Sequence, residues 1–105
     1  MRFSKVRLDH TAVITKNLVR DLEWYTKKFS CSLIYQDETW GLLDFDNICL
    51  ALVTKGEHPN HFAIIDPTIK KDKRAKRHRD GIFFKYENDP SGNVIEKIDR
   101  ASALK

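Results

Sequence analysis

The alternation of apolar and polar residues predicts a strand, a helix and three further strands in the first half of the chain. Residues 6–15 include the run Ala-Val-Ile, which is apolar on both faces and is typical of a strand covered on two sides. Asn17 is suited to cap the helix that should follow it. The apolar stripe of this helix consists of Leu18, Leu22, Tyr25 and Phe29. The three strands are expected at 31–36, 40–45 and 48–54, with connections short enough for antiparallel pairing.

A shorter version of this order occurs in the second half, after a linker at 55–60. An apolar run at 61–65 predicts a strand, and two further runs, at 82–87 and 94–99, predict a hairpin. The pattern therefore predicts an α+β fold built of two modules of the same kind, within a single domain of 105 residues. The expected modules span about 6–54 and 61–99.

The segment 67–80 departs from the pattern because it offers almost no apolar face. Asp66 and Pro67 would suit the start of a helix, but a helix without an apolar stripe has no face to bury. We therefore expect a basic loop or a short exposed helix. Residues 70–80 hold 7 basic and 2 acidic side chains, whereas the rest of the chain holds 12 basic and 13 acidic ones. The net charge of +4 thus comes from one segment that lacks aromatic residues, and we predict no specific nucleic-acid partner.

Composition excludes several other classes of protein. Apolar residues make up 41% and charged residues 32%, which is typical of a globular domain rather than a disordered chain. No uncharged apolar run approaches the roughly 18–20 residues of a membrane-spanning helix, and the N-terminal residues lack the apolar core of a signal peptide. Cys31 and Cys49 are too few for a disulfide framework. We expect reduced thiols in a cytoplasmic protein with no membrane partner.

Five short motifs stand out along the chain. They are Leu8-Asp9-His10-Thr11, Trp24-Tyr25, His61-Phe62-Ala63, His78-Arg79-Asp80-Gly81 and Asp89-Pro90-Ser91-Gly92-Asn93-Val94-Ile95-Glu96. In order and spacing they resemble the vicinal oxygen chelate superfamily, which contains glyoxalase I, the extradiol dioxygenases and the bleomycin-resistance proteins. The resemblance covers about residues 6–99. It implies two βαβββ-type modules that form an incomplete barrel around a cleft. The second module is shortened, because only 35 residues separate His61 from Glu96.

The resemblance also implies a metal site, because the ligands of this family lie on the first and last strands of each module. Carried over by position, the ligands are His10, His61 and Glu96, whereas the fourth position falls at about Ala51, which cannot bind metal. Two imidazoles and a carboxylate suit a divalent ion, with Fe(II) or Mn(II) favoured and zinc or nickel as alternatives. Three protein ligands would leave positions open for water or a bidentate substrate.

Strand alternation gives these three side chains a distinctive setting. His10, His61 and Glu96 would each lie on a strand face otherwise lined by small or aliphatic side chains. A charged glutamate on an apolar face is unfavourable unless it is paired or bound to metal. Without the resemblance, each of the three would more often be an ordinary structural or solvated residue.

Four further residues are candidates for a substrate pocket. Tyr86, ten residues before Glu96, resembles a tyrosine that hydrogen-bonds substrate oxygens in ring-cleaving dioxygenases, and it is our catalytic candidate. A half-buried structural tyrosine is the alternative. Trp40, Phe84 and His78 are candidate substrate-binding residues. For the two aromatic residues, the alternative is a place in the core.

The sequence leaves three functions open. The first is a metal-dependent enzyme of dioxygenase or lyase/isomerase type that acts on a small-molecule substrate through His10, His61 and Glu96. The second is a metal-free protein that sequesters a ligand, as bleomycin-resistance proteins do. The third is an interaction domain that uses the basic segment 70–80. We expect a homodimer, because the family pairs modules between chains and a short chain gains core in this way. Whether His10 joins His61 and Glu96 of its own chain or of a partner is open.

Overall fold

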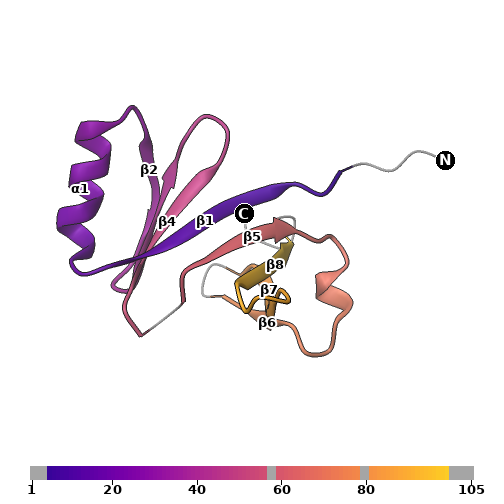
Figure 1. Ribbon diagram of the computed structural model, residues 1–105. Helices are drawn as coiled ribbons and strands as arrows, with labels where there is room; N and C mark the ends of the chain where they lie inside the picture. The colour runs from indigo at the N-terminus through magenta and orange to yellow at the C-terminus, as the bar shows by residue number, and fades with distance from the viewer. Residues whose placement is uncertain (1–4, 57–58, 79–80, 100–105) are drawn as a thin grey trace. The chain divides into compact units, whose positions relative to one another are not determined.

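The computed structural model describes residues 5–56, 59–78 and 81–99 (Figure 1). Its elements follow the order expected for two βαβββ-type modules. The first module comprises β1 (Leu8–Thr15), α1 (Leu18–Lys28), β2 (Ser32–Gln36), β3 (Trp40–Asp44) and β4 (Cys49–Thr54). The second comprises β5 (His61–Ile65), the 3-10 helix η1 (Ile69–Lys71), β6 (Lys76–Arg77), β7 (Phe83–Asn88) and β8 (Val94–Asp99). The α+β class and the shortened second module are thereby confirmed.

The chain divides into two compact units, one of residues 10–61 and one of residues 1–9 together with 62–105. In the first unit the strand order is β2-β3-β4-β1, with β1 parallel to β4 and the other neighbours antiparallel. The Asn17 side chain caps α1 by accepting a hydrogen bond from the backbone nitrogen of Arg20 at 3.1 Å, as predicted. Figure 1 shows α1 lying along this part of the sheet.

The two faces of the sheet in the first unit are packed by different groups of residues. Helix α1 covers one face through a buried leucine cluster, which consists of Leu18, Leu22, Leu43 and Leu52. The opposite face carries a second cluster, which consists of Ala12, Leu42, Ala51 and Val53 with Tyr35, Trp40 and Cys49 against it. Residues paired across neighbouring strands share a face, so the pairing of His10 with Cys49 puts His10 on the face away from the helix.

In the second unit the strand order is β5-β8-β7-β6, with β5 parallel to β8 and the other pairs antiparallel. One face holds a core cluster that consists of Ala63, Ile82 and Ile98, with Phe84 packed against it. The same face carries Glu96, because Ala63 and Tyr86 pair with it from the two sides of β8. The backbone nitrogen of Ile65 donates to the Arg7 carbonyl at 3.0 Å, which ties the start of the chain to β5.

The segment 67–80 is built around one apolar residue. Ile69, in η1, is only 2% exposed, and η1 contacts β7 and β8. Asp66 does not cap a long helix; its Oδ1 accepts from the nitrogen and the hydroxyl of Thr68 at 3.0 and 2.7 Å. The two-residue strand β6 follows and pairs with β7. Arg79 and Asp80, part of the same expectation, lie outside the described residues. In the described part of the chain, no helix has the length and apolar character needed to cross a membrane.

Candidate metal centre

Two of the three predicted ligands, His10 and His61, lie together in the first unit. Their ring centroids are 5.6 Å apart and the rings meet edge-on, at 77°. His10 comes from β1, and His61 is the first residue of β5 and is 8% exposed. The Thr11 hydroxyl on β1 donates to the His61 carbonyl at 3.4 Å and so joins β1 to the first residue of β5. The Asn60 side chain adds to this by accepting from the backbone nitrogen of Ile14 at 2.9 Å.

The hydrogen bond of His61 fixes its tautomer. Its Nδ1 lies 2.8 Å from the carbonyl oxygen of Pro59. Because a carbonyl can only accept, Nδ1 must carry the proton, and in a neutral ring the lone pair is then on Nε2. Metal-binding histidines in proteins are oriented in this way, with the second ring nitrogen donating to a carbonyl or carboxylate. The sequence gives little indication of this hydrogen bond, because the bond depends on the local backbone geometry that brings the Pro59 carbonyl to the His61 ring.

The fourth position at which the resemblance implies a ligand has no metal-binding side chain. Ala51 is 2% exposed and pairs with Ala12. The row of His10 itself continues to Cys49 and then to Asp44, whose Oδ1 is 3.9 Å from the Cys49 sulfur. Cys49 and Ala51 are two residues apart on β4 and lie on the same face of the sheet.

Glu96, the third predicted ligand, is a buried carboxylate in the second unit. It is 2% exposed, on β8 between Ala63 and Tyr86. Its Oε2 lies 2.5 Å from Nε2 of His78, a residue 18 positions earlier in the chain. Sequence reasoning placed His78 in a substrate pocket and did not foresee this contact. A buried carboxylate needs such a partner, because burial of an unpaired charge is strongly unfavourable.

The structure also brings Phe84 and Tyr86 to the surroundings of Glu96. The His78 ring stacks on Phe84, with centroids 3.7 Å apart and planes within 3°. Phe84 and Tyr86 meet edge-on at 5.5 Å. Burial, and then the charge of Glu96, raise the pKa of the Tyr86 phenol above its ordinary value. Tyr86 therefore keeps its phenolic proton at neutral pH and can donate a hydrogen bond.

Trp40 lies elsewhere, in the first unit. It lies on the same sheet face as His10. Through Val53 it is aligned with Ile14, which is four residues after His10 on β1. Its ring packs on Tyr35 with centroids 4.5 Å apart. Trp40 thus packs against the core cluster of that face.

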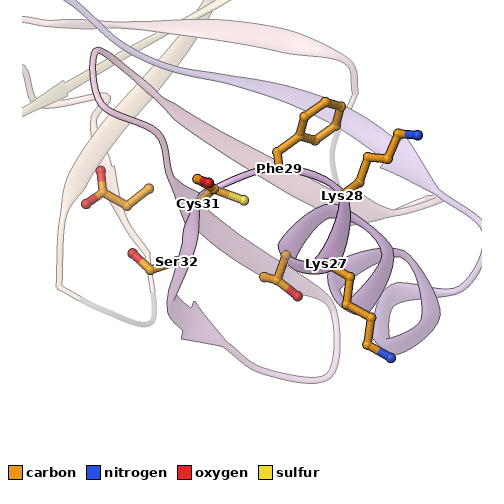
Figure 2. A pocket seen from close by; sticks show the side chains of 8 residues that line it. Lys27, Lys28, Phe29, Cys31 and Ser32 are labelled. Carbon is orange, nitrogen blue, oxygen red and sulfur yellow. The ribbon is translucent and has the colours of Figure 1, made fainter.

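A hollow of about 460 Å³ lies in the first unit, at the C-terminal end of α1 (Figure 2). It is lined by Thr26, Lys27, Lys28, Phe29, Ser30, Cys31, Ser32 and Asp44. Lysines at this end of a helix interact favourably with the helix dipole. None of the predicted site residues lines this hollow.

Comparison with known proteins gives matches among solved structures alone. No protein-family model matches the chain, and no curated protein matches it by sequence. A hypothetical protein from Bacillus halodurans C-125 matches with a TM-score of 0.75 and 13% identity, over 97% of this chain and 99% of the other. Methylmalonyl-CoA epimerase from Mycobacterium tuberculosis matches with a TM-score of 0.69 and 16% identity, over 88% and 86% of the two chains.

A third structure carries the superfamily in its name. A glyoxalase/bleomycin resistance protein/dioxygenase superfamily member from Vibrio splendidus 12B01 matches with a TM-score of 0.66 and 11% identity, over 90% of this chain and 99% of the other. The chain spans 32% of a longer match, a hypothetical protein from Staphylococcus aureus. At identities of 11–16%, the comparison establishes a shared fold only. The chain has the fold of the vicinal oxygen chelate superfamily, as its motifs led us to expect.

Proposed function

We propose that the chain binds a divalent metal ion through His10, His61 and Glu96, each offering one ligand atom, and acts as an enzyme on a small molecule. The observation that carries this proposal is the paired imidazoles of His10 and His61, with the Nδ1 proton of His61 donated to Pro59. That hydrogen bond gives Nε2 the lone pair that a metal needs. The donor set suits Fe(II) or Mn(II), with zinc and nickel as alternatives.

Strand register supports Glu96 as the third ligand. His61 and Ala63 are two residues apart on β5, so their side chains point to the same face of that strand. Ala63 pairs with Glu96, which carries its side chain to the same face of β8. Glu96 is only 2% exposed, and a bound cation would add to the His78 contact in offsetting the unfavourable burial of the carboxylate.

The chemistry would be of dioxygenase or lyase/isomerase type. A divalent metal held by these residues would supply Lewis-acid chemistry at vicinal oxygens of a substrate. Tyr86, which keeps its proton, is suited to donate a hydrogen bond to a substrate oxygen. Phe84 offers an apolar surface next to it. The name of the epimerase that shares this fold states an activity on a small-molecule thioester, which supports an enzymatic role in general terms.

A second function, metal-free sequestration of a ligand, is favoured by one observation. The His78–Glu96 contact gives the buried carboxylate a protein partner, so its burial is accounted for without a metal. A cytoplasmic location and a homodimer stay predictions from the sequence.

The experiment that separates these functions is a measurement of metal content by plasma mass spectrometry, on tag-free protein before and after soaking in Fe(II), Mn(II), Ni(II) and Zn(II). The parent should hold one ion per chain, and His61→Ala and Glu96→Gln should lose it. Glu87→Gln is the matched control, because Glu87 lies on the adjacent strand and pairs with Lys97 at 2.9 Å on the other face of the sheet. An absence of metal in every sample would favour sequestration. A metal-loaded parent should then be screened for oxygen consumption with catechols.

A further inference from the structure

His78 makes a close contact with a buried carboxylate of the second unit. Its Nε2 is 2.5 Å from Oε2 of Glu96, and the two side chains are 22% and 2% exposed. Because an ionised carboxylate can only accept, Nε2 of His78 is the donor. One oxygen of Glu96 is thus engaged by an imidazole, and this fixes the direction of its partner oxygen, Oε1.

The backbone holds His78 in this position. Its nitrogen donates to the Ile82 carbonyl and its carbonyl accepts from the Gly81 nitrogen, both at 2.9 Å. These bonds join His78, just after β6, to the residues that lead into β7. Lys76, two residues before His78, pairs with Phe84, so strand alternation carries the His78 side chain to the sheet face of Phe84 and Glu96.

The His78 ring is also held by stacking. It lies flat on Phe84, with centroids 3.7 Å apart. Phe84 itself packs against the cluster of Ala63, Ile82 and Ile98, whose members are all at most 4% exposed. The orientation of the imidazole is therefore imposed by the core and by the backbone hydrogen bonds of His78. A side chain fixed in this way can in turn fix the group that it contacts.

We propose that His78 is a positioning residue, which holds Glu96 by Oε2 so that Oε1 is directed toward a bound metal ion. The inference rests on the proposed function, since it assigns a role within the same metal site. Carboxylate ligands of metals are themselves hydrogen-bonded, and loss of such a partner typically weakens metal binding about 10–100-fold. The role differs from the substrate contact expected from the sequence, because it acts on the metal affinity with no substrate present.

Two substitutions separate the hydrogen bond from the stacking. His78→Phe keeps an aromatic ring on Phe84 but removes the donor. His78→Gln restores an N–H donor at about the position of Nε2 and gives up the stacking. Glu96→Gln, in the same series, tests the ligand itself. Thermal melts of each metal-free variant show whether the fold has survived.

The experiment is a calorimetric titration of metal-free, tag-free protein with Mn(II) and with Co(II), whose visible absorption reports the ligand set. We expect His78→Phe to bind one ion per chain about 10–100-fold more weakly than the parent, and His78→Gln to recover most of that loss. The Co(II) spectrum should keep the same bands in all three proteins.

Three contrary results are possible, and they can be told apart. If the parent binds Mn(II) and Co(II), Glu96→Gln does not, and His78→Phe equals the parent, the positioning role is wrong while the proposed function stands. If both His78 variants lose binding alike and the Co(II) bands shift, His78 is itself a ligand and the positioning role is again wrong. If the parent binds neither ion, or Glu96→Gln binds as the parent does, the proposed site is wrong, and the role of His78 falls with it.

Discussion

Tyr86 lies directly opposite Glu96 in the antiparallel pair of β7 and β8, so a phenol faces a buried carboxylate. Burial and the Glu96 charge both disfavour the phenolate, which raises the pKa of Tyr86. Above the ordinary tyrosine pKa of about 10, the unfolded chain would ionise here while the folded chain would not. This contribution to stability is therefore complete below about pH 10 and is lost as the pH rises further.

An alkaline titration followed by tyrosinate absorbance should reveal this difference. The chain has three tyrosines, and we expect Tyr86 to ionise last. Tyr86→Phe should remove the latest component of the titration and should lessen the loss of stability above about pH 10. Tyr35→Phe is the control, since Tyr35 lies in the other unit. Simultaneous ionisation of all tyrosines in the folded protein would contradict the prediction.

Gly41 should be intolerant of a side chain, because it lies beneath α1. A Cβ at this position would come within 2.8 and 2.9 Å of the two terminal methyl groups of Leu22. Leu22 is 4% exposed in the leucine cluster and has little room to move. We expect Gly41→Ala to lower the free energy of unfolding by about 1–3 kcal/mol in urea titrations.

The cause can be tested with a double-mutant cycle. Leu22→Ala alone should cost about 2–5 kcal/mol, since it leaves a cavity. In the double variant the new methyl group occupies part of that cavity, so the combined loss should be smaller than the sum of the two single losses. Additive losses would show that the clash with Leu22 does not explain the effect of Gly41→Ala.

Ile69 should hold the basic segment to the sheet of the second unit. It is 2% exposed and belongs to η1, which contacts β7 and β8. We expect Ile69→Ala to lower the free energy of unfolding by about 2–5 kcal/mol. The control is Ile34→Ala, because Ile34 is 53% exposed and its loss should change stability by at most about 0.5 kcal/mol. Equal effects of the two substitutions, in the same urea titrations, would contradict this view of the segment.

Segments with a full hydrophobic period were predictable from the sequence. The strands expected at 61–65 and 94–99 have those bounds in the structure, and Asn17 caps α1 as expected. The segment 67–80 has too few apolar residues for its elements to be predicted in this way. One buried isoleucine anchors η1, and β6 has two residues, so neither element repeats a periodic signal.

The site was predictable as a set of residue types on strand faces, but not as a set of contacts. Alternation placed His10 on the face of Ala12 and Glu96 on that of Ile98. The contact of His78 with Glu96 depends on the β6–β7 register and on the backbone hydrogen bonds that join His78 to Ile82 and Gly81. The tautomer of His61 depends in the same way on the Pro59 carbonyl. Long-range register and turn geometry leave no local pattern in a sequence.

Asp72 makes the second unit sensitive to acid. Its carboxylate accepts from the backbone nitrogen of Arg74 at 2.8 Å and from the Lys85 ammonium at 2.9 Å, which joins the basic segment to β7. The Arg74 hydrogen bond first, and then that of Lys85, lower the pKa of Asp72 to about 2. In the unfolded chain the pKa would be near 3.9, so this stabilisation is present above about pH 4 and is lost as the pH falls toward 2.

Asp72→Asn should therefore be less stable than the parent at pH 7, and the difference should shrink at pH 2.5. Asp46→Asn, the same change in an exposed turn, controls for the charge itself. A difference between Asp72→Asn and the parent that is equal at both pH values, in urea titrations, would show that the carboxylate charge contributes nothing to this link.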